Sequence, residues 1–319
     1  MPRAAPHPNV LAALSKVASD PQAARYGPIL GEPGLRQALA EEIKVQYHVS
    51  GQGVTFEDVA ITTGCNMAFL SLLMTLCPPG KSSVLLPLPA YFNHTMSLSL
   101  QDVKPVYVLC EPDNMFKASL PSARSYLASL RKGNGDRREP RMIVLVSPSN
   151  PTGTVYTNEE IKQWYDLARE YKVALVLDET YRDFVEGESG QRGLPHRLFE
   201  EPDWRSTLVS LGSFSSAYAH AMLILSLLAA KRRVEGYRIP GHRLGSIIAS
   251  PELLQHITTI CDCMQVCVPY HTPWDWLVPY SLIDLSASPT SNCSYPPSTK
   301  PSPRSSRRVF ATLTSAPSV

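Results

Sequence analysis

Short apolar runs along the chain alternate with longer stretches in which apolar residues recur every three to four positions. The short runs predict buried strands at 58–62, 83–86, 106–109, 141–147, 173–177, 208–211 and 244–249. The periodic stretches predict helices at 35–47, 69–76, 121–132 and 157–171. The apolar positions of the first helix are Leu35, Leu39, Ile43 and Val45. Because strands alternate with helices, the pattern predicts an α/β fold with a mostly parallel sheet.

Polar motifs follow three of these predicted strands. Thr63-Gly64-Cys65-Asn66 follows the first, and a strand, a glycine turn and a helix in this order can offer backbone N–H groups to a phosphate. An ordinary strand-to-helix turn would have the same sequence. Residues 148–153 and 178–181 follow the strands at 141–147 and 173–177. Open α/β sheets bind ligands at the carboxyl ends of their strands, so we expect a site there.

Composition narrows the classes of function. The chain has 319 residues, enough for one large or two modest domains, and its net charge of +2 gives no case for nucleic-acid or membrane-surface binding. Seven irregularly spaced cysteines without a signal peptide predict reduced thiols in a cytoplasmic protein. Cys261, Cys263 and Cys267 match no zinc spacing, so we expect small buried side chains and no metal.

The stretch from Ser213 to Gly245 carries two halves of one motif. Its ends, Ser-Phe-Ser and Tyr-Arg-Ile-Pro-Gly-His-Arg-Leu-Gly, fit the pattern S-F-S-K-x-Y-x-I-P-G-x-R-L-G. The lysine of that pattern is absent. Its position is Ser216 when counted from the left half and Glu235 when counted from the right half. The apolar run 221–230 between the halves is about half the length needed to span a bilayer, which favours a buried helix or a non-native insertion.

This motif belongs to a known family. From Tyr26 to about Pro269 the sequence resembles the class I/II aminotransferases of fold-type I, which use pyridoxal 5′-phosphate. The resemblance implies a partial N-terminal segment at 1–25 and a cofactor-binding large domain at 26–269. It also implies an incomplete small domain. The Ser/Pro-rich tail at 270–319 is expected to be disordered or non-native.

The resemblance also implies roles for individual residues. Asp178 matches the carboxylate beside the ring nitrogen of the cofactor, which strengthens the ring as an electron sink. Tyr181 and Asn150 match the two donors to the phenolic oxygen of the cofactor, and Tyr91 matches the aromatic ring that stacks on the pyridine. From the residues alone, Asn150 also fits a plain turn and Tyr91 a core position.

The same resemblance assigns the residues that bind the phosphate group of the cofactor. Its ligands would be Gly64, Cys65, Asn66, Ser213 and Arg243. Tyr26 matches a residue that reaches the phosphate of a neighbouring subunit, which implies a homodimer with shared active sites.

The chain departs from the family at the lysine, at the short N-terminal segment and at the replaced small domain. An in-frame retained intron would explain the first departure. If codon 216 is A|GT and codons 234–235 are GTA-G|AG, removal of about 57 nucleotides joins A to AG and restores a lysine codon. Residues 217–234 would then be translated intron, of a length that suits a fungal gene. Lys231, the nearest lysine, lies inside this segment.

The implied activity is transfer of an amino group between an amino acid and a 2-oxo acid. Within the same cofactor chemistry, a C–S lyase or a cyclopropane-carboxylate-synthase-like enzyme shares this motif set. A different class of function is a non-catalytic homologue, because without the lysine the cofactor cannot be held covalently. The sequence leaves these alternatives open.

Overall fold

The computed structural model describes residues 8–50, 53–131, 138–187, 193–214 and 240–267. All of them belong to the first of two compact units, Met1–Leu282, and the second unit lies outside the described residues. The predicted insertion at 217–234, both lysine positions and the tail at 270–319 also lie outside them.

In the described part of the chain, eight strands form one mixed sheet with the order β1-β8-β7-β6-β5-β2-β3-β4. The five strands from β7 to β3 run parallel to one another, while the pairs β1–β8, β8–β7 and β3–β4 at the two edges are antiparallel. The mostly parallel α/β sheet is therefore confirmed. The strands are β1 (Val59–Thr62), β2 (Ser82–Leu88), β3 (Lys104–Glu111), β4 (Lys117–Ala118), β5 (Glu139–Val146), β6 (Ala174–Asp178), β7 (Leu208–Ser213) and β8 (Gly245–Ile248).

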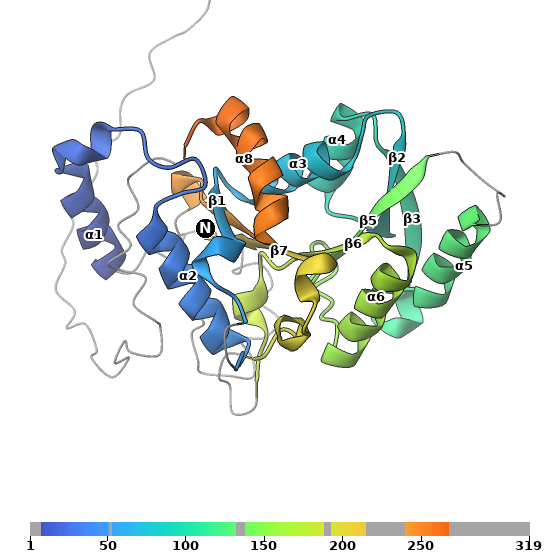
Figure 1. Cartoon of the computed structure of the whole chain (residues 1–319). Coiled ribbons are helices and arrows are strands. Elements are labelled where there is room, and N and C mark those ends of the chain that lie inside the picture. The colour runs from blue at the N-terminus through green and yellow to red at the C-terminus, as the bar shows by residue number, and fades with distance from the viewer. Residues whose placement is uncertain (1–7, 51–52, 132–137, 188–192, 215–239, 268–319) are drawn as a thin grey trace, which may run out of the picture. The chain divides into compact units, whose positions relative to one another are not determined.

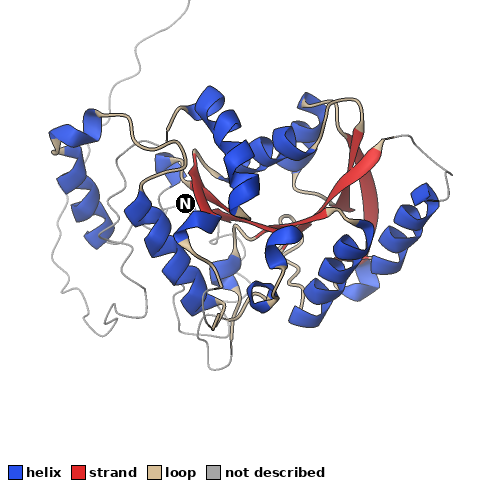
Figure 2. Ribbon diagram, in the orientation of Figure 1, coloured by secondary structure: helices blue, strands red, loops and turns tan. Residues whose placement is uncertain are grey.

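Helices cover both faces of the sheet (Figure 1). One face carries α3, α4 and α8, and the opposite face carries α2, α5 and α6 (Figure 2). The α-helices are α1 (Pro8–Ala18), α2 (Pro33–Gln46), α3 (Cys65–Leu76), α4 (Phe92–Leu100), α5 (Leu120–Arg131), α6 (Asn158–Tyr171) and α8 (Pro251–Gln265). Short 3-10 helices are η1 (Pro21–Ala24), η2 (Phe56–Asp58), η3 (Pro112–Asn114), η4 (Arg182–Phe184), η6 (Leu198–Glu200), η7 (Trp204–Ser206) and η8 (Pro240–His242).

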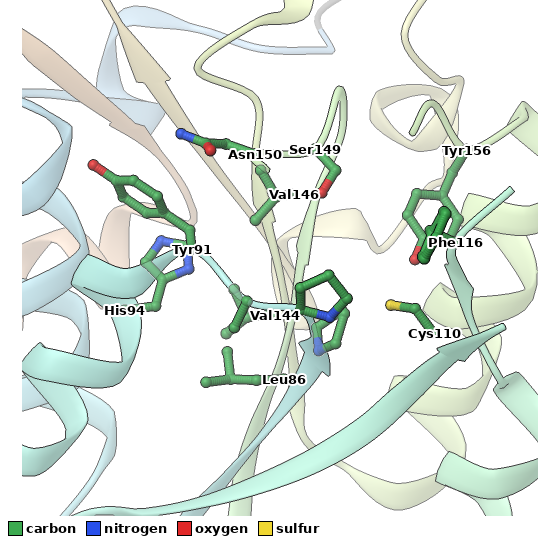
Figure 3. A pocket seen from close by; sticks show the side chains of 13 residues that line it. Leu86, Tyr91, His94, Cys110, Phe116, Val144, Val146, Ser149, Asn150 and Tyr156 are labelled. Carbon is green, nitrogen blue, oxygen red and sulfur yellow. The ribbon is translucent and has the colours of Figure 1, made fainter. Parts of the chain in front are cut away.

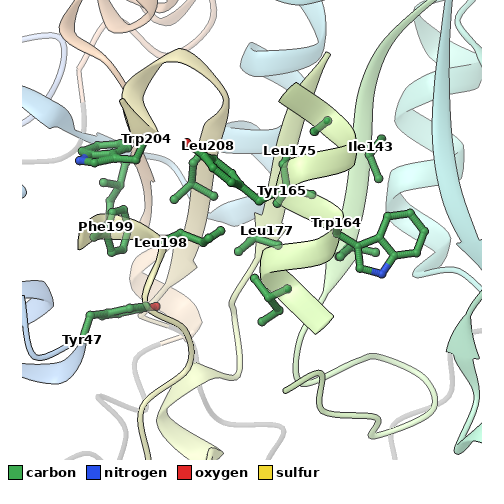
Figure 4. Close-up of a cluster of buried hydrophobic side chains, with 14 of the residues drawn as sticks. Tyr47, Ile143, Trp164, Tyr165, Leu175, Leu177, Leu198, Phe199, Trp204 and Leu208 are labelled. Atoms are coloured by element: carbon green, nitrogen blue, oxygen red, sulfur yellow. The ribbon is translucent and has the colours of Figure 1, made fainter. Parts of the chain in front are cut away.

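Each face of the sheet has its own hydrophobic cluster. On the α2 side, Tyr47, Tyr165, Phe199 and Trp204 are fully buried among branched aliphatic side chains (Figure 4). On the α3 side the cluster is built from smaller residues, with Phe69 as its buried phenyl ring. The central strands are buried on both faces, which is why they are continuous apolar runs in the sequence.

The predicted helix at 157–171 shows how local sequence sets an element's bounds. Thr157 caps α6: its hydroxyl accepts a hydrogen bond from the Glu160 N–H, and the Glu160 carboxylate accepts one from the Thr157 N–H. This capping box satisfies two backbone donors that a helix start leaves without partners. The predicted bounds are confirmed, because the helix follows directly on Thr157 and ends at Tyr171.

Several predictions needed correction. Val45 is 55% exposed, although it was expected on the apolar face of its helix, because it lies on the outer side of α2. Helix α3 begins at Cys65 rather than at 69, and α4 was missed because its polar residues obscure the helical period. Of the three clustered cysteines only Cys261 is buried, whereas Cys263 is exposed.

Among the described residues, no group of three or more histidine, cysteine or acidic side chains could hold a metal ion. None of the helices they form is long and apolar enough to cross a membrane.

Candidate active site

Asp178 is the last residue of β6 and is 3% exposed. One carboxylate oxygen, Oδ2, lies 3.0 Å from Nε2 of His94. The other, Oδ1, accepts hydrogen bonds from the Thr180 hydroxyl at 2.7 Å and the Thr180 N–H at 3.1 Å. Burial by itself would raise the pKa of Asp178, but His94 and Thr180 together lower it below its ordinary value. Asp178 is therefore a buried, ionised carboxylate at the carboxyl edge of the sheet.

His94 is a site residue that the sequence did not reveal. It lies on α4, is 2% exposed, and its ring packs 4.2 Å from the ring of Phe69. The signal that could have found it is its spacing from Tyr91. The two residues are three positions apart, at the start of a helix, so they face the same side, and their rings meet edge to face at 5.2 Å.

The N-terminus of α3 adjoins this carboxylate. Gly64 is the N-cap residue with φ of +90°, a conformation that suits glycine, and no side chain caps the helix. The N–H groups of the first helical turn, at Cys65 and Asn66, have no acceptor within their own helix. The N–H of Gly64 itself donates to Thr62 O. Gly64 therefore contributes space and backbone shape to this corner of the site.

Arg243 and two glycines complete this corner of the site. A Cβ atom on Gly64 would collide with the guanidinium of Arg243, so this cation lies directly against the start of α3. Arg243 itself has a left-handed backbone, φ of +51°, which is uncommon outside glycine. A Cβ atom on Gly245 would collide with the backbone of Gly64 and Cys65. A helix N-terminus and an arginine together attract an anion.

Ser213 and Gly245 are brought together by the sheet. They are paired across the antiparallel strands β7 and β8, and the Phe214 N–H donates to Leu244 O. The two halves of the split motif therefore meet in space, although 31 residues separate Ser213 from Gly245 in the sequence.

Two of the remaining predicted residues lie around a small pocket (Figure 3). Tyr91 and Asn150 line it, and Nδ2 of Asn150 lies 3.5 Å from the hydroxyl oxygen of Tyr181. The far wall of the pocket is formed by Cys110, Phe116 and Tyr156 (Figure 3). Tyr26 is 84% exposed.

Comparisons with known proteins agree with this arrangement. The family model described as aminotransferase class I and II matches residues 2–234. The chain belongs to this family. Its members use pyridoxal 5′-phosphate as their cofactor.

Curated members of the aminotransferase family are similar over part of the chain. An aspartate aminotransferase of Pyrococcus abyssi is 29% identical over 178 residues, which are 56% of this chain and 43% of that protein. An aromatic aminotransferase of Arabidopsis thaliana is 28% identical over 233 residues, 73% of this chain and 54% of that protein. An inactive alanine aminotransferase of Saccharomyces cerevisiae is 31% identical over 161 residues, 50% of this chain and 31% of that protein. The chain thus spans about half or less of the length of these relatives.

Solved structures show the same fold. The aspartate aminotransferase of Thermus thermophilus with maleate superposes with a TM-score of 0.68 at 22% identity, over 86% of this chain and 62% of that one. A substrate-bound BacF structure from Bacillus subtilis gives a TM-score of 0.66 at 20% identity, over 85% and 60%. These matches confirm the fold-type I architecture predicted from the sequence.

The residues present fit the cofactor of this aminotransferase family. An uncapped helix start, an arginine and two glycines without room for a side chain suit a phosphate group. A buried ionised carboxylate at Asp178 suits a protonated ring nitrogen, because a buried charge needs a partner of opposite sign. The two positions at which the family's lysine would stand, 216 and 235, carry serine and glutamate and lie outside the described residues.

Proposed function

We propose that this chain is the cofactor-binding part of an aminotransferase that moves an amino group between an amino acid and a 2-oxo acid. The observation that carries the proposal is the buried Asp178 carboxylate, ionised and held by His94, beside the uncapped start of α3. Bound pyridoxal 5′-phosphate would supply an electron sink for the α-carbon of the amino acid. The whole enzyme's substrates stay part of the proposal, since the chain covers only part of its relatives.

Each predicted residue has a task in this proposal. The N–H groups of Cys65 and Asn66, with Ser213 and Arg243, hold the phosphate, and Gly64 leaves room for it. Asp178 keeps the ring nitrogen protonated. The amide of Asn150 and the hydroxyl of Tyr181, which lie 3.5 Å apart, converge on the phenolic oxygen. The ring of Tyr91, fixed edge to face against His94, packs on the pyridine.

The missing lysine is best explained by an insertion. The lysine positions counted from the two motif halves, 216 and 235, differ by 19 residues. The pairing of Ser213 with Gly245 supports an insertion between them, because a native connection of β7 to β8 needs only a short loop at that point. We propose that residues 217–234 are translated intron and that the spliced product carries lysine at the junction.

The insertion is tested at both the nucleotide and the protein level. Genomic and cDNA sequences across codons 213–245 should show a segment beginning GT and ending AG that spliced transcripts lack. A serine codon of the TCN kind at 216 contradicts the idea. In purified protein, the spliced sequence with lysine should keep pyridoxal 5′-phosphate through denaturation after borohydride reduction. The chain as printed should release it.

A second candidate function is a non-catalytic homologue that binds the cofactor or a partner without turnover. The observation that favours it is the absent lysine, and the similarity to a yeast protein named as an inactive alanine aminotransferase is in keeping with it. Amino-group transfer by the spliced protein to a set of 2-oxo acids decides between the two. A protein with the lysine that binds the cofactor but transfers no amino group supports the non-catalytic homologue.

We also propose that the protein acts as a homodimer. Tyr26, which by family resemblance reaches a neighbouring subunit, is 84% exposed and so is available for such a contact. Light scattering coupled to size exclusion should give twice the chain mass. In that dimer Tyr26→Phe should weaken cofactor binding with no change in secondary structure. A monomer with undiminished cofactor affinity would contradict this assignment.

A further inference from the structure

The carboxylate of Asp178 accepts more hydrogen bonds than an ion pair with the cofactor's ring nitrogen would require. Oδ2 faces His94 at 3.0 Å. Oδ1 receives both the hydroxyl and the backbone N–H of Thr180, and Sγ of Cys65 lies 3.9 Å from the same oxygen. The donors to Oδ1 thus come from β6's own end and from the first residue of α3.

The side chains of Thr180 and Cys65 contact each other as well as Asp178. The Thr180 hydroxyl has one proton, and the 2.7 Å contact to Oδ1 is its shortest. Oγ1 of Thr180 and Sγ of Cys65 lie 3.5 Å apart, and the thiol donates its own proton toward Oδ1 of Asp178. Burial first, and then the charge of Asp178, raise the pKa of the Cys65 thiol well above its ordinary value, which keeps that proton in place.

Hydrogen bonds to a carboxylate stabilise its charge and reduce its basicity. A carboxylate with reduced basicity is a poorer acceptor for a further N–H group. We propose that the Thr180 hydroxyl, supported by the Cys65 thiol, weakens Asp178 as the acceptor for the cofactor's ring nitrogen and so sets the pH at which that nitrogen loses its proton. Thr180 and Cys65 are then positioning residues that act through Asp178. This inference rests on the proposed cofactor function.

Other charged or titratable groups near Asp178 come from several elements. His94 on α4 faces Oδ2, and Tyr91 precedes α4 with its ring against His94. Arg182 in η4 acts electrostatically on Cys65, and the Arg243 guanidinium lies against Gly64. Each of these groups is unchanged by a substitution at Thr180, so they do not confound a comparison of variants at that position.

The test measures binding of pyridoxamine 5′-phosphate, which needs no lysine, to the full chain as a function of pH. Thr180→Val keeps the side-chain shape and the backbone N–H but removes the hydroxyl. In a plot of affinity against pH, we expect the midpoints of both the acid limb and the alkaline limb to shift to higher pH by about one unit. This is roughly a tenfold change in each proton-binding constant. The acid limb moves because Asp178 becomes more basic, and the alkaline limb moves because the ring nitrogen then holds its proton more tightly. Cys65→Ala should move both limbs in the same direction by less.

Thr180→Ser is the matched control, because it keeps the hydroxyl and should reproduce the parent profile. Identical profiles for Thr180→Val and the parent, or equal shifts for the valine and serine variants, overturn the inference. If Thr180→Val does not fold, an unchanged profile in Cys65→Ala overturns it instead. A parent chain with no affinity for pyridoxamine 5′-phosphate at any pH overturns the proposed function, and this inference with it.

Discussion

Asp178 and Glu179 are adjacent carboxylates at the end of the same strand, and they point to opposite faces of the sheet. Asp178 lies on the α3 face and Glu179 on the α2 face, and both are at most 3% exposed. Glu179 accepts hydrogen bonds from the Tyr47 hydroxyl at 2.8 Å and the Ser210 hydroxyl at 2.5 Å, and His196 Nε2 lies 3.4 Å away. Burial would raise the pKa of Glu179, but His196, Ser210 and Arg182 lower it.

The two carboxylates share a charge state and differ in their partners. The partners of Glu179 are side chains in the interior of the fold. They come from the end of α2, from β7 and from the segment before η6, so Glu179 links these elements to one another. The partners of Asp178 lie at the carboxyl edge of the sheet, next to the uncapped start of α3. In the proposed function the same chemical group would therefore serve structure on one face and cofactor binding on the other, and the neighbouring elements decide which.

The largest expected effect comes from neutralising the cofactor-side carboxylate. Asp178→Asn should weaken binding of pyridoxamine 5′-phosphate by about a hundredfold or more, because removing one partner of a buried ion pair costs roughly 3–5 kcal/mol. Isothermal titration calorimetry at pH 7 measures this.

Glu179→Gln is the matched control for that change. It should leave cofactor affinity within about threefold, since its contacts lie on the other face. Equal losses in the two variants would show that the faces are not functionally distinct.

Two glycines offer the next test of the comparison. Gly245→Ala, on the α3 face, should lower the free energy of unfolding by about 3 kcal/mol, because its Cβ meets the backbone of Gly64 and Cys65. Gly212→Ala, on the α2 face, should cost about 1 kcal/mol, because its Cβ meets side-chain atoms of Ser246 and Arg182, which move more readily than backbone. Urea denaturation measures both. A larger loss at Gly212 would mean that the α2 face is the more tightly packed one.

Glu179 should contribute to the way the free energy of unfolding falls at acid pH. A carboxyl group whose pKa is lower in the folded state stabilises the fold above its unfolded pKa, near 4.3 for glutamate, and loses that contribution as pH falls through the folded pKa. Glu179→Gln should therefore cost about 2 kcal/mol at pH 7 and flatten the decline below pH 4.5. Urea midpoints between pH 3 and pH 7 show this. A variant whose acid decline parallels that of the parent would assign the effect to other carboxylates.

The smallest expected effect concerns the histidine behind Asp178. His94→Gln should weaken pyridoxamine 5′-phosphate binding about tenfold, because a hydrogen bond to a charged group is worth roughly 1.5–3 kcal/mol and glutamine replaces part of it. His256→Gln, an exposed position on α8, is the control and should bind like the parent. Undiminished affinity in His94→Gln would show that the hydrogen bonds from Thr180 are sufficient to keep Asp178 in place.

Much of the fold could be predicted because its determinants are local. Central strands such as 141–147 are apolar on both faces, and the Thr157 and Glu160 capping box fixes the start of α6. Helix α4 escaped prediction because only one face of it is buried and its sequence mixes serine, threonine and asparagine with apolar residues. Because α4 was not predicted, His94 was not recognised as a site residue.

The candidate site was predicted in part, and the reason for the difference is spatial. Residues at strand ends, such as Asp178 and Asn150, could be named because a parallel sheet brings its carboxyl ends to one edge. Donors from other elements could not, since nothing in the sequence places His94 and Cys65 within reach of the Asp178 carboxylate.

By itself the sequence determined the alternation of strands and helices, the family motif and the absence of its lysine, since these depend on residue type and spacing along the chain. Only the tertiary structure decided which partners the two neighbouring carboxylates meet on opposite faces of the sheet, such as His94 for Asp178 and Tyr47 for Glu179. It also showed that Ser213 and Gly245 meet despite the residues between them. The physical reason is that burial and hydrogen-bond partners, which set a carboxylate's charge and role, come from segments far apart in sequence.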